Sequence, residues 1–327
     1  MAGLLTPLQI GSLKLENRIV FPPMATEEST EDGFPKEELY EHYAERSEGP
    51  GLVIVEHSYV NTRGRLSKNQ LGIYSNEHVE SLEKLANTIK TEGAVAAIQI
   101  NHAGGQCDED ITGEKPIAPS DAYFENAKQL SLEQMDKIKK DFVSAAERAV
   151  KAGFEAVEIH GAHGFLLGQF LSPLTNQRDD EYGGEELEDR MRFPLKIVEE
   201  VNEAVEDISL LYRLGATDMD EDGLTVDEAK VFAEELVENG IDILDVSGNL
   251  CGSRPDEFEG EQGYFVPIAE NIKDAVDVPV IGVGGIKDAS YADRVIKEEK
   301  IDLVAVGRGQ WKDPKWALKA KKELKND

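Results

Sequence analysis

The feature that most constrains the fold is a regular alternation of short apolar runs and amphipathic helical segments along the whole chain. Eight runs have the character of buried strands, and a segment with helical periodicity follows each of them. Eight such units predict an α/β protein of the (β/α)8 TIM-barrel type. A doubly wound sheet alternates in the same way but usually needs fewer units. The expected strands are 18–21, 51–56, 95–100, 156–159, 209–214, 241–246, 278–283 and 302–306.

Local signals mark the ends of several expected helices. Ser131 with Gln134 and Thr225 with Glu228 have the spacing of a capping box, in which side chain and backbone bond reciprocally. Pro267 suits the first turn of a helix. The expected helices cover 37–47, 79–92, 131–152, 187–204, 225–238, a segment from Pro267, 288–298 and 314–324.

Residues 4–15 precede the first barrel strand and contain two short alternating runs around Gly11 and Ser12. This pattern predicts an N-terminal β-hairpin. No linker or shift in composition divides the rest of the chain, so we expect a single domain over 1–327.

Charge and cysteine content exclude several classes of function. The chain has 65 acidic and 35 basic residues and a net charge of −30, which disfavours nucleic acid and anionic membranes. Both a salty cytoplasm and an ordinary acidic enzyme explain this acidity. Cys107 and Cys251 lack the spacing of a disulfide framework, zinc site or iron–sulfur cluster, and we expect no metal. Without a signal peptide or an 18-residue apolar run, we expect a soluble cytoplasmic protein.

The residues just beyond the expected strands are polar, glycine-rich and cationic, although the protein as a whole is acidic. In a parallel barrel this is where active-site residues lie. Loops explain serine and glycine at such positions, but not so many histidines and arginines. The residues are 23–26, Glu56, His57, Gln99, His102, His160, His163, Arg213, Ser247, Gly248, Gly284, Gly285, Gly307 and Arg308.

Two glycine-containing turns after the seventh and eighth expected strands predict a phosphate site, since barrels commonly bind phosphate there. Gly284 and Gly285 allow backbone N–H groups to approach an anion. Arg308, which follows Gly307, can bind a phosphate through paired hydrogen bonds. The two turns together predict a phosphorylated ligand or cofactor.

The stretch 156–184 places His160 and His163 in a glycine-rich turn directly after a strand. Both imidazoles can point into one pocket, where they would suit a carbonyl oxygen or a small anion. The alternative is that one histidine caps the strand and the other packs in a core. A polar run with Asn176, Arg178 and Asp179 follows in a long loop, and we expect the chemistry to lie in this stretch.

Longer motifs in the chain resemble those of the old yellow enzyme family, from near residue 4 to near residue 320. They are N-R-I-V-F-P-P-M (17–24), Q-I-N-H-A-G (99–104), the run from H-G-A-H-G-F to D-D-E-Y-G-G (160–184), and V-G-G-I with A-V-G-R. The resemblance implies an FMN-bearing (β/α)8 barrel that takes hydride from NADH or NADPH. The hydride then passes to an electron-poor C=C, typically one conjugated to a carbonyl.

The same resemblance implies roles for individual residues. Gln99 would bond the pyrimidine edge of the flavin, and Arg213 would stabilise negative charge near its N1–C2 region. His160 and His163 match the pair that binds the substrate carbonyl oxygen, on which negative charge develops during the reaction. The implied cofactor-binding residues are Pro23, Met24, Ala25, Gln99, Arg213, Gly284, Gly285, Gly307 and Arg308.

The chain departs from the family pattern at several positions. Phe165 stands where many relatives carry the tyrosine that protonates the α-carbon, so water, His57 or Tyr264 would have to supply that proton. Ala25 replaces a frequent cysteine or threonine, Gly105 a frequent arginine, and His57 a small residue. The expected substrate pocket comprises Thr26, His57, Phe165 and Tyr264.

Two other functions stay open at this point. The first is a flavin-binding or redox-sensing barrel that has lost catalysis together with the tyrosine. The second is a phosphate-binding lyase or isomerase without flavin, for which Glu56 is the one carboxylate at a strand end. All three readings imply a small-molecule ligand, and relatives that are dimers or tetramers suggest a homo-oligomer.

Overall fold

A computed structural model, which describes residues 2–205 and 208–326, closes eight parallel strands into a barrel. The expected (β/α)8 architecture is confirmed, and β12 pairs back to β3 to complete the ring. The largest shift of a boundary is in β4, which continues past the expected residue 56 to Tyr59. In spatial order the strands are β3 (Ile19–Phe21), β4 (Leu52–Tyr59), β5 (Val95–Asn101), β8 (Ala156–Gly161), β9 (Ser209–Gly215), β10 (Ile243–Ser247), β11 (Val280–Gly282) and β12 (Leu303–Ala305).

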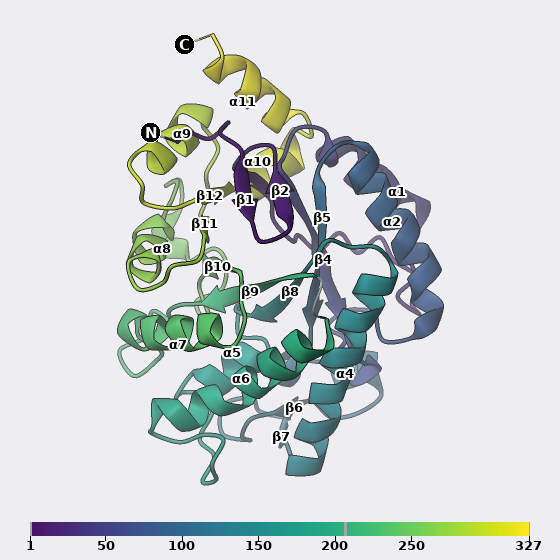
Figure 1. The fold of residues 1–327 in the computed structure, drawn as a ribbon. Helices are drawn as coiled ribbons and strands as arrows, with labels where there is room; N and C mark the ends of the chain where they lie inside the picture. The colour runs from purple at the N-terminus through teal and green to yellow at the C-terminus, as the bar shows by residue number, and fades with distance from the viewer. Residues whose placement is uncertain (1, 206–207, 327) are drawn as a thin grey trace.

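Helices surround the strands in a ring, as Figure 1 shows. Both predicted capping boxes form, at Ser131 and at Thr225, and α8 begins one residue before Pro267. The helices that follow the eight strands are α1 (Glu37–Ser47), α2 (Val79–Thr91), α4 (Leu132–Lys151), α6 (Leu187–Ala204), α7 (Val226–Glu238), α8 (Val266–Lys273), α9 (Ala289–Lys297) and α11 (Trp316–Leu324).

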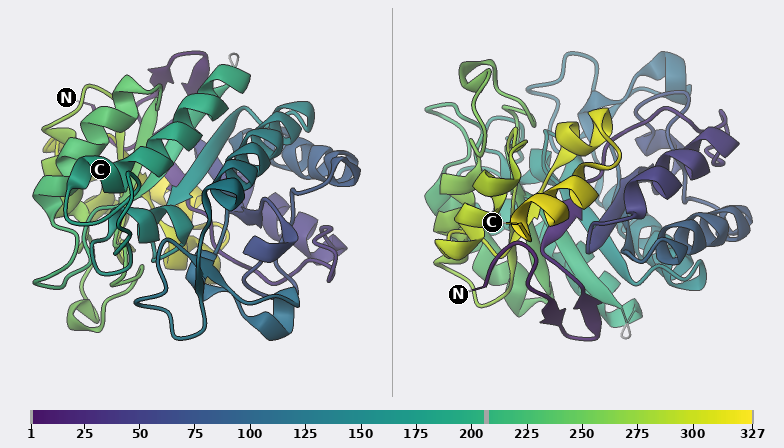
Figure 2. Two further views of the ribbon diagram at one scale, coloured as in Figure 1. Left: turned by 90° about the horizontal axis from the view of Figure 1, so that it is seen from below. Right: turned by 90° about the horizontal axis from the view of Figure 1, so that it is seen from above.

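The predicted N-terminal hairpin is present as β1 (Leu8–Ile10) and β2 (Leu13–Leu15), which pair antiparallel. The hairpin lies at one end of the barrel in both views of Figure 2. Its buried Ile10, Leu13 and Leu15 belong to the same apolar cluster as the inward-facing residues near the starts of the strands. The hairpin therefore closes the amino-terminal mouth of the barrel and leaves the other end for a site.

Several short elements were not expected from the sequence. The connection from β5 to α4 contains α3 (Glu109–Thr112), β6 (Ile117–Ala118) and β7 (Lys128–Gln129). Helix α5 (Leu166–Leu171) follows β8 and is buried along its whole length, and α10 (Gly307–Lys312) follows β12. The stretch after β8 is thus partly a core helix rather than a continuous loop.

The barrel interior changes from apolar to polar along the strands. Alternate residues of a strand face inward, and near the strand starts these are apolar residues such as Ala156 and Leu211. Two residues further along the same strands stand Glu158 and Arg213, which are also buried. The interior is therefore polar toward the carboxyl ends of the strands. Within the described residues no helix is long and apolar enough to cross a membrane, and no cluster of potential metal ligands occurs.

Candidate active site

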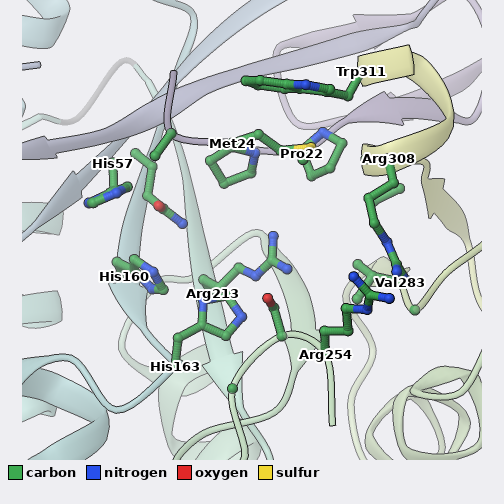
Figure 3. Close-up of a pocket in the computed structure, with 18 of the residues that line it drawn as sticks. Pro22, Met24, His57, His160, His163, Arg213, Arg254, Val283, Arg308 and Trp311 are labelled. Carbon is green, nitrogen blue, oxygen red and sulfur yellow. The ribbon is translucent and has the colours of Figure 1, made fainter. Parts of the chain in front are cut away.

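A cavity of about 560 Å³ opens at the carboxyl ends of the barrel strands (Figure 3). Fourteen of the fifteen predicted site residues line it, although they come from segments up to about 280 residues apart in the chain. The barrel brings these together: Pro23, Met24, Ala25, His57, Gln99, His160, His163, Phe165, Arg213, Tyr264, Gly284, Gly285, Gly307 and Arg308.

Thr26 is the predicted pocket residue that does not line the cavity. Its backbone N–H donates to Glu56 Oε1 at 3.2 Å, and its side-chain hydroxyl accepts from the backbone of Glu28. Glu56 is itself 1% exposed and does not line the cavity. Its carboxyl group holds the segment after Ala25 in place. Glu56 therefore cannot act as a base on a ligand in the cavity. A lyase or isomerase without flavin would need such a base, and Glu56 was the one candidate carboxylate.

The buried Glu56 carboxyl gives a testable dependence of stability on pH. Burial is the main cause that raises its pKa to about 7. Since the folded-state pKa lies above the unfolded value, the stabilising contribution is complete below pH 4.5 and is lost as the pH rises through about 7. The variant Glu56→Gln carries no such proton. Between pH 5 and pH 8 the free energy of unfolding of the wild type should therefore fall by about 3 kcal/mol relative to that of this variant. Urea unfolding of both proteins at the two pH values measures this, and an unchanged difference would contradict it.

Nine further residues line the cavity that the sequence analysis did not assign. Four come from the connection after β10 and from α10, where no motif marks them, and four lie within motifs already quoted, at Pro22, Val283, Ile286 and Ala305. Arg254 and Trp311 are the largest, and single residues of these types carry no periodic or spacing signal. The nine are Pro22, Gln106, Gly252, Ser253, Arg254, Val283, Ile286, Ala305 and Trp311.

His160 and His163 meet at one side of the cavity, with ring centroids 5.1 Å apart and planes at 86°. His163 has a φ of 57°, a left-handed conformation that is uncommon outside glycine, and its N–H donates to Gly248 O. This turn directs both rings into the cavity (Figure 3). His160 Nδ1 accepts from Ala162 N at 3.3 Å, so its Nε2 carries the hydrogen. Burial lowers the pKa of both rings well below the usual value, and they are neutral at pH 7.

Arg213 projects from β9 into the cavity and is held by a buried charge network. Its Nη1 donates to Asp245 Oδ2 at 2.7 Å, and Asp245 is fully buried. Asp245 Oδ1 and Glu158 Oε2 are buried as well, and neither has a hydrogen-bond partner among the described residues. Gln99 in turn donates to Glu158 Oε1 at 2.8 Å. Burial, followed by repulsion from Asp245, raises the pKa of Glu158 well above its usual value. Burial also raises the pKa of Asp245, and the positive charge of Arg213 opposes the rise at both carboxyl groups.

The opposite end of the cavity has the features of an anion site. Gly284 and Gly285 have φ values of 117° and 65°, which glycine adopts without strain. Arg308 donates to the neutral Tyr264 hydroxyl at 3.2 Å, and Arg254 points toward Arg308 from the other side (Figure 3). The residues that line the cavity include three arginines and no carboxylate. In a protein with a net charge of −30, this arrangement favours a bound anion such as phosphate.

The polar run after α5 does not contribute to the cavity, and the expectation that this part of the loop carries chemistry is wrong. Arg178 is 4% exposed, donates to the carbonyl oxygens of Pro119 and Leu130, and pairs with Asp180. Asn176 donates to the carbonyl oxygens of Phe170 in α5 and of Tyr182 in the loop. These side chains satisfy buried backbone groups, so their role is to hold the loop.

Comparison with known proteins places these features in a family. A model of the NADH:flavin oxidoreductase / NADH oxidase family matches residues 3–327. The chain is 41% identical to the NADH oxidase of Thermoanaerobacter brockii over 98% of its own length, and spans half of that longer protein. It is 39% identical to the NADPH dehydrogenase of Bacillus subtilis (strain 168), covering 99% of this chain and 96% of that protein.

A solved structure agrees with the fold. The old yellow enzyme homologue of Zymomonas mobilis superposes with a TM-score of 0.85 and covers 98% of this chain and 93% of that one, at 23% sequence identity. The match of the family model over nearly the whole chain, together with the barrel and its cavity, identifies the group. The chain belongs to the NADH:flavin oxidoreductase / NADH oxidase family, the FMN-dependent oxidoreductases of the old yellow enzyme type.

Proposed function

We propose that the chain reduces a C=C bond conjugated to a carbonyl group, with NADH or NADPH as the source of hydride. His160 and His163 bind the carbonyl oxygen of the substrate. The observation that carries this proposal is the meeting of two neutral imidazoles, 5.1 Å apart, at the cavity wall. Neutral rings donate hydrogen bonds to the oxygen, and they carry no positive charge that would stabilise the bound substrate as strongly as the transition state. Their donors favour the negative charge that develops on the oxygen.

The shape and polarity of the cavity fit FMN. Arg213 lies beside the histidines, where it suits the pyrimidine edge of the ring together with Gln99, and Arg308 lies across the cavity from them, where it suits the phosphate together with the glycine turns (Figure 3). The cavity volume of about 560 Å³ is typical of a cofactor site. Pro23, Met24 and Ala25 would line the ring between these ends. When bound, FMN supplies the hydride transfer, and the protein supplies position and electrostatics.

The charge balance supports a small-molecule substrate rather than a nucleic-acid partner, because a net charge of −30 repels phosphate polymers. Cys107 and Cys251 are free thiols, in keeping with a cytoplasmic protein. We treat 1–327 as one FMN-binding unit, and a homo-oligomer remains part of the proposal.

A second candidate function is a flavin-binding or redox-sensing barrel with weak or lost reductase activity. Phe165 favours it, because a phenyl ring at the cavity wall cannot donate a proton. Steady oxidation of NADH or NADPH with any alkene acceptor would contradict this second function.

The direct test is an absorbance spectrum of the purified protein, followed by an anaerobic screen of alkene acceptors. Bound oxidised flavin absorbs near ~450 nm. A protein that is colourless and stays colourless after incubation with FMN would overturn the proposed function. A flavin-loaded protein that oxidises neither NADH nor NADPH would favour the sensor instead.

A prediction on cofactor affinity follows from the anion site. The variant Arg308→Ala removes the charge-assisted hydrogen bonds to the phosphate and should weaken FMN binding about 10–100-fold. Fluorescence titration of the apoprotein with FMN gives the Kd. Arg294→Ala is the matched control, since it removes an arginine that lines neither the cavity nor the adjoining pocket beside Arg308. Equal losses in both variants would indicate a long-range charge effect rather than a phosphate contact.

A further inference from the structure

His57 reaches the cavity through a β-bulge in β4. The register between β4 and β5 shifts between Val55 and Ser58, so that Glu56 and His57 together stand opposite Gln99 alone. Along a regular strand Leu52, Ile54 and Glu56 face inward, and His57 would face the helices. The extra residue turns the strand, so that Glu56 stays buried and His57 lines the cavity.

Two amide groups determine which nitrogen of His57 carries the hydrogen. Gln70 accepts from Leu66 N at 2.7 Å through its oxygen, so its amide nitrogen is the atom that faces His57 Nδ1 at 2.8 Å. The amide nitrogen of Asn101 lies 3.3 Å from the same atom. Nδ1 therefore accepts hydrogen bonds and has no room for a proton. The hydrogen is on Nε2, which has no partner among the described residues.

His57 is consequently a neutral hydrogen-bond donor and not an acid. Burial lowers its pKa to about 4, in agreement with the locked Nδ1. The suggestion that His57 replaces the missing tyrosine as the source of the proton is not supported by this geometry. The hydroxyl of Tyr264, the other suggested source, donates to Ser253 O and contacts Arg308 at the anion end.

The three cavity imidazoles form a row beside Phe165. The ring of His160 lies 5.1 Å from His163 and 6.4 Å from His57. Phe165 stacks on His57 at 5.5 Å and meets His160 edge-on at 4.9 Å. This end of the cavity therefore offers one donor more than a single carbonyl oxygen needs, and no acidic group.

We infer that the preferred substrate is a doubly activated alkene, whose α-carbon carries a second carbonyl oxygen that accepts from His57 Nε2. This inference rests on the proposed function and names the substrate class of the same site. The first carbonyl oxygen lies between His160 and His163. A second acceptor one or two bonds from that carbonyl falls on the far side of His160, where His57 is.

The chemistry of such a substrate also accounts for Phe165. Hydride brings two electrons and forms the new C–H bond at the β-carbon, and the π pair of the alkene moves to the α-carbon. Two carbonyl groups share the resulting negative charge, so this carbanion is far more stable than a simple enolate. Water then delivers the proton to the α-carbon without help from a side chain. The alkene is reduced and the nicotinamide oxidised, so atoms and electrons balance.

The test compares three alkenes that share one ring: 2-cyclohexenone, its 2-methoxycarbonyl derivative and its 2-sec-butyl derivative. The sec-butyl group is an alkyl control with the same number of non-hydrogen atoms as the ester group and no acceptor. In the variant His57→Phe, which keeps a ring against Phe165, kcat/KM for the ester should fall about tenfold. The ratio of kcat/KM for the ester to kcat/KM for the alkyl control should also fall about tenfold, because the alkyl group offers no acceptor to His57. His57→Ala gives a second variant without the donor in case the larger ring disturbs folding.

A second arm tests the role of Phe165. The variant Phe165→Tyr should raise kcat for 2-cyclohexenone more than kcat for the ester, because the ester needs no acid. An equal gain for both alkenes would overturn the inference. The inference would also be overturned if the ratio of kcat/KM for the ester to kcat/KM for 2-cyclohexenone is the same in the wild type and the His57 variants.

Phenol binding separates this result from failure of the proposed function. Phenol presents one oxygen and reports on the His160–His163 site, so a protein in which that site is intact should bind it, as followed by the change in flavin absorbance. A protein that neither binds phenol nor reduces any of the three alkenes contradicts the proposed function itself. A protein that binds phenol and reduces the alkenes, but whose preference for the ester does not depend on His57, contradicts the inference and leaves the proposed function in place.

Discussion

Replacement of His160 by alanine should lower kcat for an activated alkene by about 10²–10³, because one of two donors to the developing oxyanion is lost. His163→Ala should have a similar effect. The double variant should lose less than the product of the two, since both rings serve one oxygen. Stopped-flow measurement of the alkene-dependent step gives kcat directly. Phenol titration of the same variants reports the loss of the oxygen site without turnover.

Two control variants separate the loss of a hydrogen-bond donor from the general effect of removing a buried histidine. His160→Asn keeps an N–H donor near the same place and should retain more activity than His160→Ala. His78→Ala removes a histidine that is 1% exposed but lies outside the cavity, and it should affect stability without changing phenol binding. If His160→Ala and His163→Ala leave both phenol binding and kcat unchanged, the oxygen-binding role is wrong.

The variant Arg213→Met should destabilise the protein by about 3–5 kcal/mol, since it leaves the Asp245 carboxylate buried without its cation. Burial already raises the pKa of Asp245, and Arg213 opposes that rise. Without the arginine, Asp245 takes up a proton more readily, so the loss of stability should shrink as the pH falls. Urea unfolding of the apoprotein at pH 5 and pH 8 measures both effects.

A double variant separates the buried charge from the loss of packing. Arg213→Met with Asp245→Asn leaves no uncompensated carboxylate, and most of the lost stability should return. FMN affinity should stay low in both variants, because the guanidinium at the pyrimidine end is missing from each. If the double variant is less stable than Arg213→Met, the ion pair is not the main contribution at this position.

The barrel could be predicted from the sequence because its signal is repeated. Each strand is a short apolar run, each following helix is amphipathic, and capping boxes at Ser131 and Thr225 mark two helix starts. Errors in single boundaries, such as the end of β4, do not alter a count of eight units. Helices α5 and α10 escaped this reasoning, since each has six residues, too few to show a helical period.

The site was predictable where a residue stands near the carboxyl end of a barrel strand. His160, Arg213 and Gln99 alternate inward on their strands, so their place at the cavity follows from the barrel geometry. Arg178 has the same chemistry as Arg213 and stands in a polar run, yet its guanidinium binds backbone carbonyls in the core. Residue type alone does not distinguish these two uses of a buried arginine.

The sequence by itself determined the number of strands, the end of the barrel at which the site lies, and the acidic surface. It could do so because periodicity and strand-end position are local properties of a chain. Only the tertiary structure decided that His57 faces the cavity, that Nδ1 of this ring is locked by Gln70, and that Arg213 pairs with Asp245. These features depend on a one-residue bulge and on contacts between residues that are far apart in the chain. Such contacts form only when the barrel closes, so no local pattern in the sequence reports them.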